Sequence, residues 1–317
     1  MVHIVLLGGT GFVGQALLPV LADCGHTSTV LTRHKVRHRE INLIPGTQLK
    51  QADVYNPEDL CRYLESADAV INLVGILNER GRNGAGFHRA HVQVVDGLID
   101  ACVKTGVKRI LHMSALNAGA GKSHYLESKG LAERRLARAA ELDDLQVTIF
   151  QPSVIFGKND DFFNRFESLL RIMPVMPLAR PTARFQPVFA GDVVQAFALA
   201  LEDPGTHGKT FALCGPKTYT LRELVEFTAS AAKLKRRVIS LPNWLARIQA
   251  AVMDFVPGKP FSSDNYRSLK IDSTSKLNGL GYFKIIPQSI ETQVFRYLGS
   301  GAHQGLLNRA RANRTSR

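Results

Sequence analysis

The sequence predicts an α/β fold in which helices cover both faces of a doubly wound parallel sheet and a smaller, α-rich C-terminal lobe follows. Short apolar runs alternate with amphipathic runs through the first half of the 317 residues, which is the pattern of strands joined by crossover helices. The run AVINLV at 69–74 is almost continuously apolar, as expected of a strand buried on both faces. A glycine-rich turn separates the first strand from the first helix.

Strands are expected wherever a short run is rich in β-branched and aliphatic side chains. The run at 48–52 is weaker than the others, and the run at 185–189 belongs to a less regular second half. The predicted strands are 3–7, 28–32, 48–52, 69–74, 109–113, 146–150, 185–189 and 210–213.

Helices are expected where apolar residues recur at helical spacing between recognisable ends. Pro57 suits a first helical turn, Gly106 suits a helix end, and Thr220 with Glu223 forms a capping box. The predicted helices are 15–22, 57–66, 87–105, 123–141, 160–173, 192–202, 220–233 and 243–255.

Two unequal structural units are expected from this order of elements. Residues 1–157 form the main unit, and 185–213 are expected to return to it. Residues 158–184 and 214–300 form the smaller lobe. The tail 301–317 ends with four arginines in its last nine residues, and we expect it to be disordered.

Composition limits the classes of partner and compartment. The net charge is +13, which favours anionic partners such as nucleotide phosphates or an acidic membrane surface. The chain contains no recognised nucleic-acid-binding module, so no nucleic acid is expected. Four scattered cysteines suit a reducing compartment. The first strand begins at residue 3, and the chain lacks a long apolar run. We therefore expect a cytoplasmic protein, with peripheral attachment to the inner face of a membrane as the alternative.

The glycine-rich turn predicts a dinucleotide site. Glycines at 8, 9, 11 and 14 fit both G-x-G-x-x-G and G-x-x-G-x-x-G. Glycine lets the backbone approach a pyrophosphate, whose charge is stabilised at the N-terminus of the following helix. The alternative is a tight turn between strand and helix that binds nothing.

The end of the second strand indicates which nucleotide is bound. NAD-binding sites usually carry an acid about 20 residues after the glycines. Here Thr32 is followed by Arg33, and no acid occurs before Glu40. A guanidinium pairs well with a 2′-phosphate, so we expect NADP(H), with NAD(H) second; the alternative is a solvated basic loop. Asp53 either contacts the adenine amino group or only caps its own turn.

Tyr125 and Lys129 form a Y-x-x-x-K pair on one face of a predicted helix. A nearby ammonium lowers the pKa of a phenol, so this tyrosine is expected to exchange a proton with a substrate oxygen. Ser114 ends the preceding strand and is expected to bind the reacting carbonyl, with Ser123 as its alternative. The other interpretation is a surface pair without a catalytic role.

Six motifs make the chain resemble the short-chain dehydrogenase/reductase superfamily, in its extended or atypical branch. Within it, the chain most resembles the nucleotide-binding accessory subunit of mitochondrial complex I and its bacterial relatives, through NLVGI (72–76) and DFFNRF (161–166). The similarity extends to about residue 298 and implies a Rossmann fold that binds NADP(H). The shared motifs are GGTGFVG (8–14), NLVG (72–75), HMSA (112–115), YLESK (125–129), QPSVIFG (151–157) and FQPVFAGDVVQA (185–196).

The resemblance implies that the glycines contact the pyrophosphate, that Tyr125 and Lys129 lie near the nicotinamide ribose, and that 152–155 line the nicotinamide. The residues expected to bind the cofactor are Gly8, Thr10, Gly11, Phe12, Val13, Gly14, Arg33, Asp53, Val54, Leu73, Val74, Gly75, Lys129, Pro152, Val154 and Ile155.

Two functions are therefore expected. One is an NADP(H)-dependent oxidoreductase or epimerase-like enzyme that uses Tyr125, Lys129 and Ser114 on a carbonyl, quinone or sugar-type substrate. The other is a non-catalytic NADPH-binding accessory, assembly or sensor protein linked to a respiratory complex or to quinone metabolism. No metal site is expected, because His88 and His91 lack further ligands at suitable spacing.

The segment 241–256 has one apolar helical face, formed by Trp244, Ile248, Ala251 and Phe255. Such a face is more often part of a core, and we expect that here. The alternative is that this segment, together with the basic tail, contacts a membrane surface or a partner protein.

Overall fold

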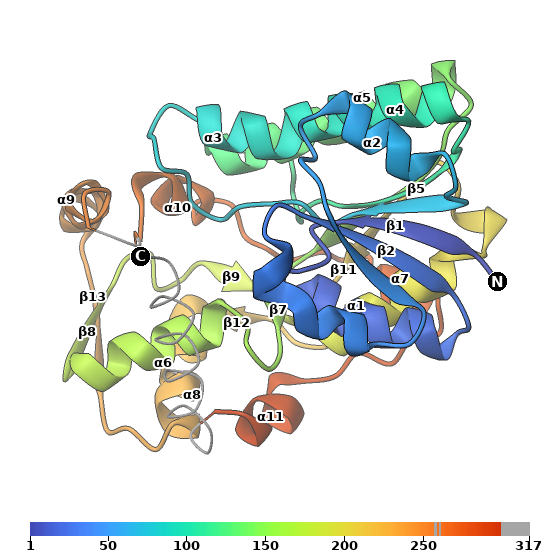
Figure 1. The fold of residues 1–317 in the computed structure, drawn as a ribbon. Helices are drawn as coiled ribbons and strands as arrows, with labels where there is room; N and C mark the ends of the chain where they lie inside the picture. Colours follow the sequence, from blue (N-terminus) through green and yellow to red (C-terminus); the bar gives the residue numbers. More distant parts are fainter. Residues whose placement is uncertain (257–258, 260, 299–317) are drawn as a thin grey trace.

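The computed structural model describes residues 1–256, 259 and 261–298, and the tail with its expected disorder lies outside them. Seven strands form one parallel sheet in the order β11-β6-β5-β4-β1-β2-β3 (Figure 1). The predicted doubly wound sheet is confirmed. The strands are β1 His3–Leu7, β2 Thr27–Thr32, β3 Thr47–Gln51, β4 Ala69–Asn72, β5 Arg109–Met113, β6 Gln146–Pro152 and β11 Lys209–Leu213.

The order of the strands places the site. From β1 the chain adds β2 and β3 on one side, and from β4 it adds β5 and β6 on the other, so the winding of the sheet reverses between β1 and β4. These two strands lie side by side, with Leu7 opposite Asn72. In open parallel sheets a crevice forms at this switch point, beyond the carboxyl ends of the strands. The turns that follow β1 and β4 are therefore adjacent.

Helices cover both faces of the sheet (Figure 1). On one face α1 and α7 contribute to a core with Leu17 and Phe197 at its centre, and on the other α2, α4 and α5 pack around Leu98 and Leu136. These helices are α1 Phe12–Asp23, α7 Ala190–Leu201, α2 Pro57–Leu64, α4 Val94–Thr105 and α5 His124–Leu142.

The helix predicted over 87–105 is interrupted. It begins as the short α3 (Ala85–Phe87), passes through a π-helical turn at His88–Gln93 and continues as α4. A π turn adds a residue to the helical repeat and often occurs at functional sites. Here it brings His91 inward, where the side chain is buried.

The second lobe lies beyond the carboxyl edge of the sheet and has its own apolar core around Phe163 and Leu224. Residues 185–189 are not the single strand that we predicted, because Pro187 has no N–H to donate to a ladder; β9 and β10 lie on either side of it and pair outside the main sheet. The elements are β7 Ile155–Phe156, α6 Phe162–Ile172, β8 Val175–Leu178, β9 Arg184–Phe185, β10 Val188–Phe189, β12 Tyr219–Thr220, α8 Leu221–Ala231, β13 Arg237–Ser240 and α11 Ile290–Gln293.

Helices α9 (Asn243–Met253) and α10 (Ser263–Ser268) complete the lobe. Short 3-10 turns occur at Lys35–Leu43, Pro204–Thr206, Gly279–Gly281 and Val294–Arg296. Among the described residues, no helix combines the length and apolar character needed to cross a membrane.

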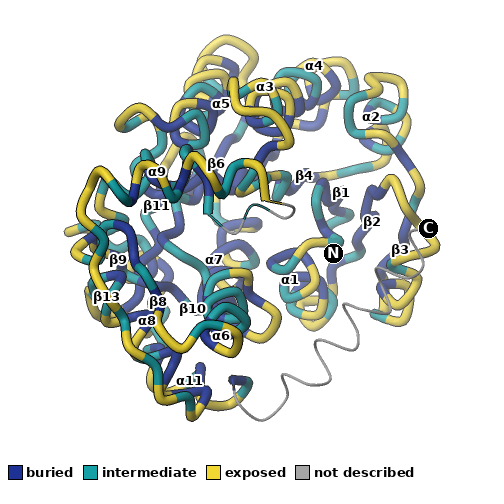
Figure 2. Tube along the Cα trace, turned by 90° about the vertical axis from the view of Figure 1, so that its left-hand side faces the viewer, coloured by how far each residue is buried: buried dark blue, intermediate teal, exposed yellow. Residues whose placement is uncertain are grey.

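The expectation that the apolar face of α9 is part of the core is wrong. Trp244 is 63% exposed and Phe255 is 77% exposed. The helix packs instead through the small side chains of Ala246 and Ala250, which share a small core with Ala179 and Tyr266. Figure 2 shows α9 at the surface of the molecule, with exposed residues along its length.

Arg109 joins four elements inside the fold. Its buried guanidinium donates to the Gln146 carbonyl at 2.8 Å and to the Thr148 and Thr206 hydroxyls at 2.9 Å each. It also donates to the Ala200 carbonyl at the end of α7. Burial lowers the pKa of Arg109 to about 10, so the group stays charged at neutral pH.

Substitution of Arg109 by methionine is expected to lower the free energy of unfolding by about 3 kcal/mol, because it leaves several buried acceptors unpaired. Urea denaturation measures this change. The matched control is Arg138→Met on the exposed side of α5, which is expected to change stability by less than about 0.5 kcal/mol. Equal losses in the two variants would contradict the assignment.

Candidate active site

The β1–α1 turn needs glycine at two positions. Gly8 has a φ of +76°, and a Cβ there would lie 2.8 Å from the Leu73 carbonyl carbon. A Cβ on Gly14 would lie 2.4 Å from the Cα of Gly9. The first contact brings the turn against the end of β4, and the second brings α1 against the turn.

The N-terminus of α1 can hold an anion. Its N-cap is Gly11, whose amide donates to the Gly8 carbonyl at 3.0 Å, and no side chain of the described residues caps the helix. The first-turn amides therefore remain available at the positive end of the helix dipole. A pyrophosphate fits this arrangement, because the glycines also clear space for its approach.

Four further residues that were expected to bind the cofactor lie in or near this turn or after β3. The Thr10 carbonyl accepts from the side-chain Nε2 of Gln15 at 3.0 Å. The Phe12 ring lies beside Gly157, where a Cβ would come within 3.3 Å of it. Val13 is buried in the core beneath the turn, and Val54, after β3, is half-buried against the opposite core.

Two further expected contacts lie at the ends of β2 and β3. Arg33 is exposed directly after β2, and no carboxylate among the described residues lies within ion-pair distance of it. Lys35 and Arg37 are exposed in the 3-10 turn that follows. Asp53 is exposed after β3, and its Oδ1 accepts from the Tyr55 amide at 3.1 Å, which is the turn-capping alternative.

The segment after β4 is held by a buried amide that the sequence analysis did not identify. Asn72 Oδ1 accepts from the Val74 amide at 3.0 Å, and its Nδ2 lies 3.2 Å from Nδ1 of His112 on β5. These two interactions of Asn72 fix Leu73 and Val74 next to Gly8. A polar residue inside each of two apolar strands was the available signal.

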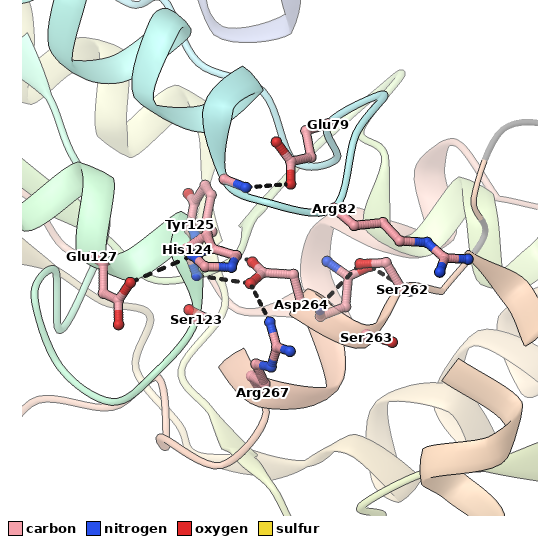
Figure 3. A network of polar contacts seen from close by, with 12 residues as sticks. Glu79, Arg82, Ser123, His124, Tyr125, Glu127, Ser262, Ser263, Asp264 and Arg267 are labelled. Atoms are coloured by element: carbon pink, nitrogen blue, oxygen red, sulfur yellow. Dashed lines mark hydrogen bonds and ion pairs between the residues drawn. The ribbon is translucent and has the colours of Figure 1, made fainter. Parts of the chain in front are cut away.

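The start of α5 is capped from both lobes (Figure 3). The Ser123 hydroxyl accepts from the Leu126 amide at 3.2 Å, as the N-cap of α5. Asp264 of α10 accepts from the amides of His124 at 2.7 Å and Tyr125 at 3.1 Å. The second lobe therefore determines where the helix that carries Tyr125 begins, which the sequence analysis did not foresee.

Lys129 joins the ends of β4 and β5. Its Nζ donates to the Met113 carbonyl at 3.0 Å and lies 3.3 Å from where a Cβ of Gly75 would be. Burial lowers the pKa of Lys129 to about 8, with partial compensation from the Glu133 carboxylate. The ammonium is charged at neutral pH but is easily deprotonated.

The Tyr125 ring packs edge-on against Phe87 and His91, with centroid distances of 5.9 and 5.6 Å. Burial raises the pKa of the phenol to about 12. The expectation that Lys129 lowers this pKa is wrong for the protein alone, because desolvation of the ring dominates. Tyr125 is therefore protonated at neutral pH.

His91 links the β4 loop to α5 and was considered from the sequence only as a metal ligand. Its Nε2 accepts from the Ile76 amide at 3.2 Å, so Nδ1 carries the proton and donates to the Ser128 hydroxyl at 2.8 Å. That hydroxyl donates to the Tyr125 carbonyl at 2.9 Å. Burial lowers the pKa of His91 to about 2, which keeps the ring neutral and the chain of bonds intact.

Ser114 follows β5 and is 4% exposed. Its hydroxyl makes no hydrogen bond of good geometry, although the Glu133 carboxyl lies beside it. Pro152 ends β6, Val154 follows it, and Ile155 begins β7. The Pro152 carbonyl accepts from Leu116 and the Val154 carbonyl from Val188, both at 2.9 Å.

A cavity of about 220 Å³ lies beside the N-terminus of α5. The Glu79 carboxylate accepts from the Gly84 amide at 2.8 Å and the Gly86 amide at 2.9 Å, and this shapes the loop on one side of the cavity. Asp254 and Lys259 also line the cavity. Within the described residues, no cluster of His, Cys, Asp and Glu side chains is arranged to hold a metal ion.

Replacement of Lys129 by methionine is expected to raise the free energy of unfolding at pH 7 by about 2 kcal/mol. The folded-state pKa lies below the ordinary value of 10.5, so the buried charge destabilises the fold below about pH 8. This penalty declines as the pH rises from about 8 toward 10.5.

Urea denaturation at pH 7 and at pH 10 tests this linkage. The difference between Lys129→Met and the natural chain is expected to shrink at the higher pH. Lys104→Met, at an exposed position on α4, serves as the control and is expected to show no such trend. A constant difference for Lys129→Met at both pH values would contradict the account.

Comparison with known proteins agrees with this geometry. Residues 4–214 match the model of the NAD dependent epimerase/dehydratase family. The chain is 28% identical to the Arabidopsis thaliana mitochondrial protein named NADH dehydrogenase [ubiquinone] 1 alpha subcomplex subunit 9 over 281 residues, 86% of this chain and 68% of that protein. It is 25% identical to a ceramide reductase of Caulobacter vibrioides over 245 residues, 76% of this chain and 74% of that protein.

Among solved structures, a double mutant of the dTDP-glucose 4,6-dehydratase of Streptomyces venezuelae, with NAD bound, has a TM-score of 0.73 at 19% identity. The match covers 94% of this chain and 95% of that one, and at this identity it shows the shared fold alone. The resemblance to extended short-chain dehydrogenases and reductases is confirmed. The chain belongs to the NAD dependent epimerase/dehydratase family.

Proposed function

We propose that the chain binds a nicotinamide dinucleotide, NADP(H) in preference to NAD(H), and reduces a carbonyl group. One observation carries the proposal: the uncapped N-terminus of α1 shares an edge of the sheet with Ser114 and Lys129, on either side of the β1–β4 switch point. A charge-binding helix end and proton-handling side chains are the two parts that such a reaction needs.

The nucleotide would lie along the ends of the strands. The first-turn amides of α1 would hold the pyrophosphate, and Gly75 would allow the ribose to reach Lys129. Arg33, exposed after β2, would pair with a 2′-phosphate. When bound, the reduced nicotinamide supplies a hydride.

The side chains would supply the matching proton. Tyr125 is protonated at neutral pH because burial raises its pKa to about 12, which suits a proton donor in the direction of reduction. The phenol proton would pass from Oη to the carbonyl oxygen as the hydride reaches the carbonyl carbon. The hydroxyl of Ser114 would donate a hydrogen bond to that oxygen, and solvent would return the proton to Tyr125.

A second function is favoured by a separate observation. The Tyr125 ring is packed between Phe87 and His91, where it holds α5 in place without any reaction. Together with similarity to a subunit named for a respiratory NADH dehydrogenase, this supports a non-catalytic NADPH-binding accessory or sensor protein. Both functions share the nucleotide site and differ in whether the nucleotide is consumed.

The nucleotide preference is tested at Arg33. Its replacement by alanine is expected to weaken NADPH binding roughly tenfold or more, with little change for NADH, since only NADPH carries the 2′-phosphate. Calorimetric titration measures both affinities. Arg37→Ala is the matched control in the same exposed basic segment. Tighter binding of NADH than NADPH by the natural chain would contradict the preference.

The reaction is tested at Tyr125. With a panel of ketones and quinones, the natural chain is expected to oxidise NADPH, and Tyr125→Phe to lose at least about 100-fold in rate while binding NADPH unchanged. Absorbance of the reduced nicotinamide measures turnover. If neither protein consumes NADPH with any compound while both bind it, the accessory function stands. Turnover that the substitution leaves unaffected contradicts the proton-transfer role.

A further inference from the structure

We propose that helix α9 is a docking surface for an anionic lipid bilayer. The surface, called here the α9 face, consists of Trp244, Ile248, Val252 and Phe255. It lies on the second lobe, away from the β1–α1 turn, and has no part in the proposed reaction. The proposal therefore stands or falls separately from the proposed function.

The α9 face is exposed by the geometry of the helix. Its members are spaced by four, four and three residues, which places them on one side. They are 63%, 52%, 58% and 77% exposed. Most of the large apolar side chains of this segment thus point to solvent. The opposite side of the helix is buried through the small side chains of Ala246 and Ala250. A contiguous apolar face of this kind marks an interaction surface.

Charge around the α9 face identifies the partner. Within 243–256 the charged residues are one cation, Arg247, and one acid, Asp254. The acid is buried, with a 7% exposed side chain, and lies 3.9 Å from Arg82. Arg247 is exposed on α9 itself. The Arg82 guanidinium lies 3.8 Å above the Phe255 ring. The segment therefore presents apolar side chains and cations together, without an exposed carboxylate of its own.

Carboxylates from the neighbouring elements add no exposed negative charge beside the α9 face, because they are buried and hydrogen-bonded. Glu79 accepts two backbone amides in its loop and is 7% exposed. Asp264 caps α5 and is 9% exposed. An apolar helical face flanked by Arg82 and Arg247, with a tryptophan near its start, matches the side chains that bind at the headgroup level of an anionic membrane. A second copy of the chain would instead bring like charges together across the face.

Trp244 is the single tryptophan of the chain, so its fluorescence reports on the α9 face directly. The full chain would be mixed with vesicles of phosphatidylcholine, or of phosphatidylcholine and phosphatidylglycerol in equal parts. With the anionic vesicles we expect a blue shift of the emission and quenching by brominated acyl chains. Both effects are expected to be weak with phosphatidylcholine alone and to decrease with added salt.

Matched variants separate docking from general adhesion. Ile248→Gln is expected to weaken partitioning roughly tenfold, through lost apolar burial, and Arg247→Gln about fivefold, through one lost cation. Leu142→Gln is the control, because Leu142 is 68% exposed at the far end of α5, and it is expected to bind like the natural chain.

Several results would overturn the proposal. Emission that is already blue-shifted and insensitive to vesicles would mean that the chain covers its own α9 face. A shift that depends on protein concentration and not on lipid would mean self-association. An equal loss in Leu142→Gln and Ile248→Gln would mean that the face has no special role. Binding that is the same for both vesicle compositions would remove the anionic partner.

Discussion

The close approach of the first turn to the end of β4 is the constraint on which the site depends. A side chain on Gly8 would collide with the Leu73–Val74 peptide, so the turn and the β4 loop can be adjacent only because this residue is glycine. That contact brings the open N-terminus of α1 to the switch point of the sheet. The loop continues to Gly75, which in turn leaves room for Lys129.

Polar side chains buried beneath this edge keep the loops in place. Asn72 holds the β4 loop from the strand side, and His91 holds it from the π turn. Such groups destabilise a core unless they are paired, and most here are. The exceptions among the described residues include His112 Nε2 and the Ser114 hydroxyl. Buried polar atoms without a hydrogen-bond partner of good geometry are typical of a site prepared for a ligand.

Local patterns predicted the parallel sheet, most helices and the glycine turn, because these depend on spacing along the chain. Contacts between distant segments were not predictable in this way. Nothing near Asp264 indicates that it caps a helix 140 residues earlier, and the π turn at His91 has no local signal. The face of α9 was misassigned because periodicity shows that a face is apolar without showing which side is buried.

The central claim is that a dinucleotide binds across the β1–α1 turn and the β4 loop. Hydrogen–deuterium exchange of the full chain with and without NADPH tests it most directly, because the amides that would hold the ligand have no side-chain cap among the described residues. We expect slower exchange over 8–15 and 73–77 when NADPH is present, with α9 unchanged. NADPH binding that leaves both segments unprotected, or that protects only the second lobe, would contradict the account.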